Sequence, residues 1–212
     1  MIKYVSYNMH GYYNGLSMLH ELCKSYDIVL IQEHCKLDKL NLVNSNFNCA
    51  AVSAKDAKCA SSILRGRPFG GTAILCIKNL INMGIHVKLL YRDEESRFIT
   101  VMLAKRLVLS CVYLPCHSAG TDYEVELSSV LARLEGILDK YSDFVHIIAV
   151  DYNFECSASH KGYNLFSNLV STYNLECMDN EQDDCGNTFF TKLWAINHGL
   201  IMYLLVILYI TG

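Results

Sequence analysis

Apolar runs of strand length that end abruptly in polar residues constrain this chain more than any other feature. Residues 28–31 read IVLI and are followed at once by the polar triplet QEH. Residues 145–150 read VHIIAV and are followed by DYN. A largely continuous apolar run of this length is typical of a strand buried on both faces. Such strands need a layer of structure on each side, so the sequence predicts a multilayered core.

The rest of the chain mixes strand patterns with helix patterns. A wide apolar stripe predicts a long helix over residues 123–141, and shorter stripes predict helices around 16–26 and over 163–173. We find neither internal repeats nor low-complexity segments. The sequence therefore predicts an α/β (α+β) domain. Further strands are expected at residues 2–7, 47–52, 72–77, 87–91, 98–103 and 107–113.

Composition narrows the class of protein. Among 212 residues, 52% are apolar and 18% are charged, which excludes intrinsic disorder. Eighteen basic and 21 acidic residues give a net charge of −3, so nucleic-acid binding would need a local basic patch. The ten cysteines show neither CxxC nor zinc-site spacing, and the N-terminus lacks the pattern of a signal peptide. We therefore expect a reduced, intracellular protein.

Four polar side chains follow strand-like segments directly, namely Asn8, Glu33, Asp151 and Asn153. In a packed α/β sheet, side chains at strand ends collect at one rim. Mg²⁺ prefers oxygen ligands and is often held by one or two carboxylates together with substrate phosphate. Each residue taken singly fits an ordinary solvated loop position. As a set, they predict a site for Mg²⁺, with Mn²⁺ as the alternative ion.

Five segments carry a family resemblance: SYNMHGY (6–12), DIVLIQEH (27–34), GRPFGGTAIL (66–75), VLSCVYLP (108–115) and IIAVDYNFE (147–155). In this order and spacing they resemble the endonuclease/exonuclease/phosphatase superfamily. The motifs NMHG, QEH and GRPFGG most resemble those of the endonuclease domain of non-LTR retrotransposons. The resemblance implies a four-layer, DNase I-like sandwich of two mainly antiparallel sheets flanked by helices. It also implies metal-dependent cleavage of a phosphodiester.

The resemblance assigns roles to five residues. Glu33 resembles the main Mg²⁺ ligand of the family, and Asn8 resembles the asparagine beside metal and phosphate. Tyr113 resembles the tyrosine that contacts the scissile phosphate, although a strand-end aromatic in the core is the alternative. Asp151 resembles the carboxylate that orients or deprotonates water, and Asn153 resembles the asparagine that fixes the phosphate oxygens. These residue types suit metal-assisted attack of water on an anionic phosphodiester.

Two further features bear on the site. Arg65 and Arg67 lie in a basic loop over residues 55–71, from which contacts to DNA phosphates would be sequence-neutral and salt-sensitive. A solvated loop is an equally good interpretation of that segment. His34, next to Glu33, either reaches the site or is a packed or solvent-facing histidine.

The chain departs from the family pattern at two places. Val150 stands where the family usually has a glycine, which predicts some displacement of Asp151 because valine resists backbone angles that glycine permits. The match also stops after residues 188–190, where the family continues to a catalytic histidine and its aspartate. Asp184 is the last acid of the chain, and the only later histidine is His198. The sequence thus predicts that this pair and the last strands of one sheet are missing.

We accordingly divide the chain into an incomplete domain over residues 1–192 and a hydrophobic tail over 193–212. Residues 200–210 are continuously apolar or aromatic, whereas a membrane span needs about 20 such residues. Three interpretations of the tail stay open: the product of a truncation or frame shift, a membrane anchor, and a substitute core element. Membrane association is the less favoured of these.

The sequence predicts a Mg²⁺-dependent phosphodiester hydrolase that acts on DNA, impaired by loss of the C-terminal Asp-His segment. As a retrotransposon endonuclease it would be nuclear and would accompany a reverse transcriptase domain in the full-length element. One alternative is a catalytically inactive remnant or a nucleic-acid-binding module. The other is a phosphatase or phospholipase of the same superfamily.

Overall fold

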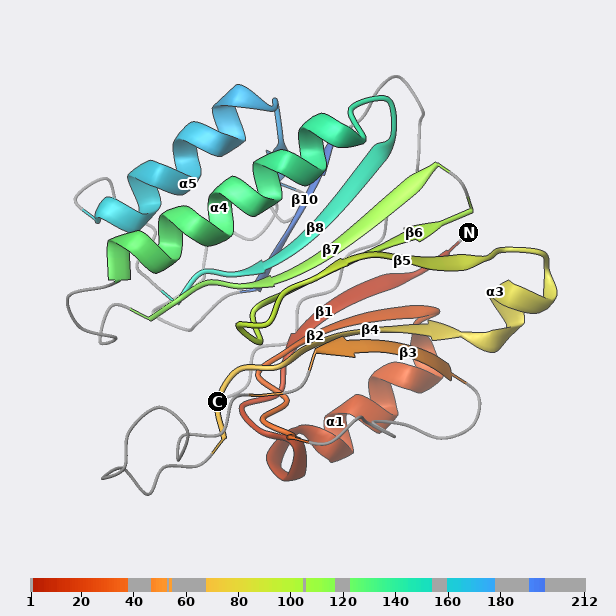
Figure 1. The fold of residues 1–212 in the computed structure, drawn as a ribbon. Coiled ribbons are helices and arrows are strands. Elements are labelled where there is room, and N and C mark those ends of the chain that lie inside the picture. Colours follow the sequence, from red (N-terminus) through yellow and green to blue (C-terminus); the bar gives the residue numbers. More distant parts are fainter. Residues whose placement is uncertain are drawn as a thin grey trace.

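The fold consists of two mixed β-sheets packed face to face, with helices on both outer faces (Figure 1). These four layers are the arrangement that the sequence predicts, and the predicted fold class is confirmed. The structure is a computed structural model, and it describes residues 2–37, 47–52, 54, 68–104, 106–116, 123–153, 160–177 and 191–196.

The smaller sheet contains four strands. They are β1 (Tyr4–Asn8), β2 (Ile28–Gln32), β4 (Thr72–Ile77) and β3 (Phe47–Val52), in this spatial order. β1 and β2 run parallel, and the other neighbours run antiparallel. Helix α1 (Tyr12–Ser25) covers the outer face with Leu19 and Leu22 buried against the sheet. Because the second sheet covers the inner face, every residue of β1 and β2 is buried.

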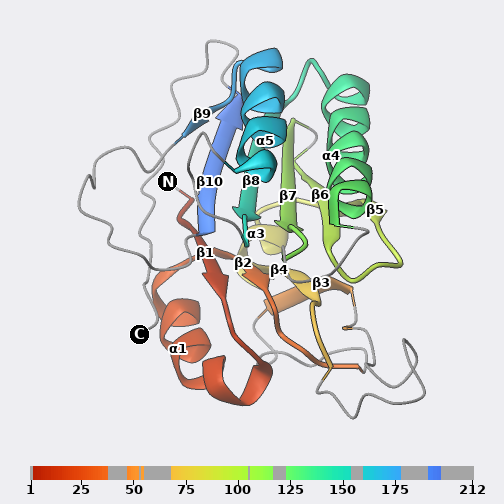
Figure 2. The ribbon, with the colours of Figure 1, turned by 90° about the vertical axis from the view of Figure 1, so that its left-hand side faces the viewer.

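The larger sheet contains six strands among the described residues. They are β5 (Val87–Arg92), β6 (Phe98–Leu103), β7 (Leu107–Tyr113), β8 (Val145–Asp151), β10 (Thr191–Ile196) and β9 (Glu176–Cys177), in this spatial order. Only β7 and β8 pair in parallel, so both sheets are mainly antiparallel, as predicted. Helices α4 (Tyr123–Lys140) and α5 (Lys161–Thr172) lie side by side over its outer face (Figure 2).

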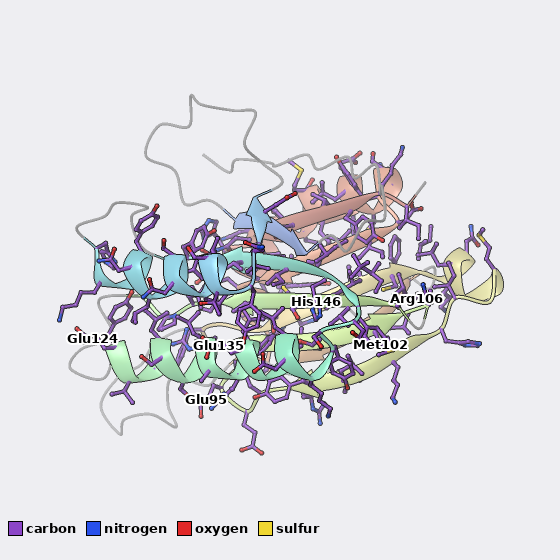
Figure 3. All side chains as sticks on the ribbon, turned by 90° about the horizontal axis from the view of Figure 1, so that it is seen from above. Glu95, Met102, Arg106, Glu124, Glu135 and His146 are labelled. Atoms are coloured by element: carbon purple, nitrogen blue, oxygen red, sulfur yellow. The ribbon has the colours of Figure 1, made fainter. Side chains whose placement is uncertain are left out.

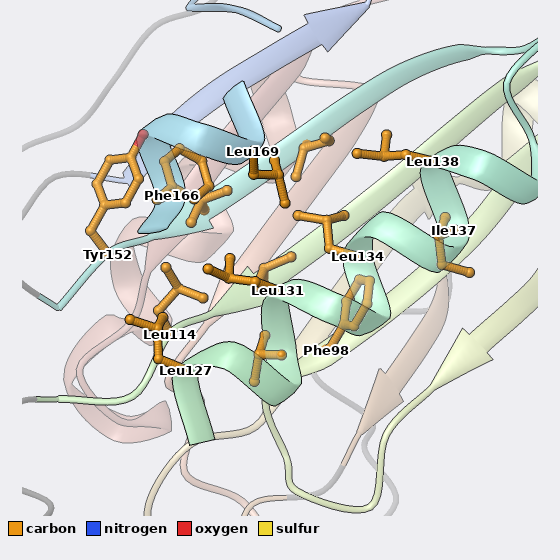
Figure 4. Packing of buried hydrophobic residues seen from close by; sticks show 14 of the residues in the cluster. Phe98, Leu114, Leu127, Leu131, Leu134, Ile137, Leu138, Tyr152, Phe166 and Leu169 are labelled. Atoms are coloured by element: carbon orange, nitrogen blue, oxygen red, sulfur yellow. The ribbon is translucent and has the colours of Figure 1, made fainter. Parts of the chain in front are cut away.

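The apolar stripe of α4 forms the core beneath that helix layer. Leu127, Leu131 and Leu134 point from α4 toward the sheet and toward α5, where Phe166 and Leu169 meet them (Figure 4). Burying one such side chain stabilises the fold by about 1.5–3 kcal/mol. The regular stripe therefore explains why the sequence locates this helix to within one residue of its observed end.

Three short elements escaped the sequence analysis: α3 (Lys78–Asn82), β9 and β10. β10 pairs with β8 from Thr191 opposite Asp151 to Ile196 opposite His146. Residues 193–196, which the sequence assigns to the tail, thus continue a strand of the sheet beyond the expected boundary at 192. The remainder of the tail and residues 188–190 lie outside the described residues.

Among the described strands, β1 has a hydrogen-bonded neighbour on one side only, so the four-stranded sheet ends there. Within the described part of the chain, no helix combines the length and the apolar character that crossing a membrane requires.

The carboxyl ends of the two parallel pairs meet at one rim of the sandwich. β1 and β2 end there in the smaller sheet, and β7 and β8 end there in the larger one. The sheets touch just below this rim, where the Cys111 thiol donates to the carbonyl oxygen of Ile31 at 3.2 Å. The Gln32 side chain donates to the same sulfur at 3.2 Å. This contact fixes the distance between the two sets of strand ends.

Candidate active site

Four of the sequence-predicted residues converge at this rim. Asn8 is the last residue of β1, Glu33 follows β2, Tyr113 ends β7 and Asp151 ends β8. The Asn8 amide donates to Glu33 Oε2 at 3.0 Å and also donates to Asp151 Oδ2. The Tyr113 hydroxyl donates to Glu33 Oε1 at 2.7 Å. These hydrogen bonds join side chains from both sheets into one cluster.

The fifth predicted residue, Asn153, lies beside the same cluster. Its backbone N–H donates to Asp151 Oδ1 at 3.3 Å, and its side-chain amide donates to the Leu114 carbonyl at 2.7 Å. Asn153 adopts a φ of 50°, a left-handed conformation that asparagine tolerates better than most residues. The turn after β8 therefore brings this carboxamide back toward the end of β7.

Hydrogen bonds hold Glu33 in its ionised form. Burial alone would raise its pKa, but hydrogen bonds from His10, Tyr113 and Asn8 outweigh the burial and lower the pKa to about 2. Hydrogen bonds to the charged form of a carboxyl favour that form. Glu33 is consequently an anion throughout the physiological pH range.

Asp151 has the opposite electrostatic character. Its complete burial, followed by repulsion from the negative charge of Glu33, raises its pKa to about 7. Hydrogen bonds from Asn8 and from the backbone of Asn153 act in the other direction and are weaker. The two carboxyls thus differ in proton affinity although they share a hydrogen-bond donor, and Asp151 is the more basic of the two.

The donor set suits a hard divalent cation. Two carboxyls, Glu33 and Asp151, face each other across the amide of Asn8, and a cation beside them would relieve the repulsion that raises the pKa of Asp151. Among the described residues, no group of three or more His, Cys, Asp or Glu side chains gathers as a metal cage. Mg²⁺ does not need such a cage, because it is usually bound by one or two carboxylates plus waters and phosphate.

His10 belongs to the site, although it was not among the residues predicted from the sequence. Its Nδ1 lies 3.2 Å from Glu33 Oε2, and its backbone N–H donates to Asn8 Oδ1 at 2.8 Å. Its φ of 47° turns the chain sharply after β1 and so directs the ring back to Glu33. The position of His10 two residues after Asn8 is the only sequence signal that could have suggested this role.

His34 does not enter the site, which resolves the open alternative in favour of packing. It is fully buried, and its Nδ1 accepts a hydrogen bond from the backbone of Lys36 at 3.1 Å. A Cβ at Gly71 would lie 2.3 Å from His34 Cε1, so only a glycine fits there. The His34 and Cys35 amides donate to the Gly71 and Gly70 carbonyls at 3.3 and 3.0 Å. This pairing fixes the segment that carries Glu33.

Arg97 supports Tyr113 from behind and was also missed. Its guanidinium carbon lies 5.5 Å from the centroid of the Tyr113 ring, and its carbonyl accepts the Tyr113 backbone N–H at 2.8 Å. Arg97 is itself held by Glu126 of α4 at 3.2 Å. The larger sheet and its helix layer thereby fix the orientation of the tyrosine.

The two remaining expectations have different outcomes. Val150 lies within strand β8, and the left-handed conformation of this segment occurs at Asn153, so the expected displacement of Asp151 stays a prediction. Asp151 reaches Asn8 without a glycine before it. Arg65 and Arg67 lie outside the described residues.

Solved structures share this fold. An AP endonuclease from Archaeoglobus fulgidus matches with a TM-score of 0.64 and 13% identity over 92% of this chain and 86% of that one. The 3′ phosphatase NExo from Neisseria, bound to a product DNA hairpin, matches with a TM-score of 0.63 and 14% identity over 92% and 86%. The catalytic domain of human nocturnin gives a TM-score of 0.59 and 15% identity over 92% and 81%.

These likenesses establish the DNase I-like fold of the endonuclease/exonuclease/phosphatase proteins for this chain. At 13–15% identity they establish the fold alone. No protein-family model matches the sequence, and none of the curated proteins matches it either.

Proposed function

We propose that this chain is a metal-dependent phosphodiester hydrolase of the retrotransposon endonuclease type, with DNA as its substrate. The convergence of Asn8, Glu33, Tyr113 and Asp151 at one rim carries the proposal. The nucleases and the phosphatase that share the fold support the reaction class. The retrotransposon type further entails a reverse transcriptase domain in the full-length element and a nuclear location.

Each rim residue has a task in such a reaction. Glu33, held ionised, and Asn8 would hold Mg²⁺ or Mn²⁺, which when bound neutralises charge that develops on the phosphate oxygens. Asp151 is the more basic carboxylate, so it would accept a proton from the attacking water on its Oδ2 or Oδ1. Tyr113 and Asn153 carry hydrogen-bond donors, the hydroxyl and the amide, that can turn to a phosphate oxygen.

We expect turnover to be slow. Residues 185–212 contain no acid and a single histidine, His198, so this stretch does not supply the Asp-His pair of the family pattern. Loss of one placed electrostatic donor typically costs about 10²–10³ in rate. This observation also favours a second candidate, a nucleic-acid-binding module that retains the metal site without cleavage.

Metal binding is the first test. Titration calorimetry with Mg²⁺ and with Mn²⁺ should give measurable binding to the wild-type chain and weak or undetectable binding to Glu33→Gln. Glu124→Gln is the matched control, because Glu124 is an exposed glutamate on α4 that pairs with the surface Lys161. If Glu33→Gln binds the ions as well as the wild type does, the assignment of Glu33 is wrong.

Cleavage is the second test, and it separates the candidate functions. With protein in excess over supercoiled plasmid, the hydrolase predicts slow nicking that Asp151→Asn abolishes. Binding of metal and DNA without nicking would select the binding module instead. Hydrolysis of p-nitrophenyl phosphate without nicking would select a phosphatase, the activity printed for the Neisseria neighbour.

A further inference from the structure

An aromatic surface adjoins the candidate active site and has no part in the proposed chemistry. It consists of Tyr12 and Tyr13 at the start of α1 and Lys36 after β2, and we call it the tyrosine–lysine surface. Tyr13 is 88% exposed, more than any other large hydrophobic side chain among the described residues. A tyrosine ring exposed this fully contributes little to folding, because it buries almost no area.

The surface is tied rigidly to the site. The Gly11 amide, just before α1, donates to the Glu33 carbonyl at 2.8 Å. Lys36 Nζ lies 4.1 Å above the centroid of the Tyr12 ring. The rings of Tyr12 and Tyr13 meet edge to face at 79° with centroids 5.4 Å apart. These contacts therefore fix the position of Tyr13, which lies only a few residues from the proposed metal ligands.

The charges around this surface favour an anionic ligand. The first turn of α1 contains no acidic residue, and Lys36 and His10 supply cationic or neutral groups. Among the described residues, Glu33 is a carboxylate that adjoins this surface, and its side chain is 15% exposed and is engaged by Asn8 and Tyr113. The acid of α1, Glu21, lies in the last half of the helix and pairs with Lys24.

We propose that the tyrosine–lysine surface binds unpaired nucleotides of the strand whose phosphodiester lies at the site. A base stacks on the free face of the Tyr13 ring, and Lys36 contacts a neighbouring phosphate. An aromatic platform beside a cation is the chemistry by which proteins hold single strands without reading sequence. The inference rests on the proposed function, in that it names the form of nucleic acid that this site takes.

A fully paired duplex does not meet this requirement. Its bases are stacked on one another, so a ring can reach a base face only where the strand is frayed, nicked or single. Phosphate contacts alone do not distinguish the two forms, because both carry the same charges. The surface therefore predicts a preference for single strands or frayed junctions over continuous duplex.

Binding is measured by fluorescence anisotropy with a short labelled oligothymidylate and, separately, with a blunt-ended duplex of two fully complementary strands. EDTA is present, so that no metal and no cleavage contribute. Tyr13→Ala should weaken single-strand binding by about 5- to 150-fold, which corresponds to the usual worth of one stacked base. Tyr13→Phe keeps the ring and should bind within about twofold of the wild type.

Two further variants complete the design. Met83→Ala is the matched control, since Met83 is 76% exposed in the turn between α3 and β5, away from the rim. It should leave binding unchanged. Lys36→Gln should weaken binding and reduce the slope of log affinity against log salt by about 0.7, the value for one phosphate contact on a single strand.

The inference is overturned if Tyr13→Ala binds the oligothymidylate as the wild type does. It is also overturned if Tyr13→Ala weakens single-strand and duplex binding equally, because stacking would then not be involved. The melting temperature of each variant confirms that it is folded. The proposed hydrolase fails separately: Glu33→Gln should lose metal binding yet keep single-strand binding, whereas Tyr13→Ala should keep metal binding.

Discussion

The two ends of the sandwich are built in different ways. Figure 3 shows Glu95 and Glu124 toward the rim that carries the site, and Arg106 and His146 toward the opposite end. Left-handed backbone conformations gather at the rim, whereas the opposite end has few of them among the described residues, such as Gly84 and Ala104. Those at the rim are His10, Gly11, Glu33, Cys35, Gly70, Gly71, Ser96 and Asn153.

At the rim, left-handed residues lower the stability of the fold and at the same time position the residues of the site. A left-handed residue other than glycine costs about 1–3 kcal/mol and persists only where its surroundings fix it. At the rim these residues bring Glu33 and Asn153 beside Asp151, an acid whose pKa is raised by burial and then by repulsion from Glu33. At the opposite end, Gly84 has nothing within 4 Å of the place where a Cβ would sit. The rim thus holds more left-handed residues and is crowded at Gly71, whereas the backbone at Gly84 lies in open space.

Gly71→Ala should give the largest loss of stability. The new Cβ would meet the His34 ring at 2.3 Å and would sit on a backbone with a φ of 88°. Overpacking and backbone strain together should lower the free energy of unfolding by about 2–6 kcal/mol. Urea denaturation measures this loss.

Gly84→Ala is the matched control for that prediction. Gly84 also has a positive φ, 82°, but its Cβ would meet no atom. The variant should cost only the conformational term, about 1 kcal/mol. Equal losses for the two variants would show that the clamp between Gly71 and His34 does not distinguish the rim from the opposite end.

Asp151→Asn should stabilise the metal-free chain at alkaline pH. Because the pKa of Asp151 is raised from 3.8 to about 7 on folding, its contribution to stability is present below about pH 4 and is lost as the pH rises through about 7. The asparagine variant lacks this loss. Above the folded pKa, the free energy of unfolding of the variant should exceed that of the wild type by on the order of 2 kcal/mol. The gain is limited to this size because an amide keeps only one of the two hydrogen-bond acceptors.

Thermal melts of both proteins in EDTA over a pH series measure the effect. The difference between the two melting temperatures should grow from about pH 4 to about pH 7 and then level off. A constant difference over this range would mean that Asp151 is not protonated in the folded state. Added Mg²⁺ should reduce the advantage of the variant, because a cation favours the charged carboxylate.

Tyr113→Phe should have the smallest effect among the substitutions at the rim. It removes the hydroxyl that donates to Glu33 Oε1 and should cost about 1.5 kcal/mol at neutral pH, as for a hydrogen bond to a charged group. Folding lowers the pKa of Glu33 to about 2, so its contribution is present above the unfolded value of 4.5 and is lost as the pH falls through 2. The variant raises that folded pKa, so its cost should shrink on acidification. A cost that is independent of pH would contradict this link.

Much of the rim could be predicted because its residues follow apolar strands. Glu33 and Asp151 come directly after apolar runs, which predict buried strands. Neighbouring parallel strands have their carboxyl ends at the same edge of a sheet. His34 and Gly71 meet across 37 positions, and the conformation that joins them depends on both sheets. Such a contact leaves no periodic signal, so His34 had to remain an open alternative.

The elements that sequence analysis missed share a physical reason. β10 contains Trp194 within a stretch that lacks polar–apolar alternation, and it is a strand because it pairs with β8 on one side and β9 on the other. Its identity as a strand comes from its partners rather than from its own pattern. Arg97 likewise acquires its role only when α4 brings Glu126 to it.

The hydrogen bonds from Asn8 to Asp151 and from Tyr113 to Glu33 have a consequence for the history of such chains. Each bond runs from one sheet to the other, so the same side chains that would bind metal also fasten the two halves of the sandwich. A chain that had lost turnover would still keep them for as long as it had to fold. Residues such as Tyr13, which join no strands, would change first, and under the proposed binding of nucleic acid they are the better record of whether that binding is retained.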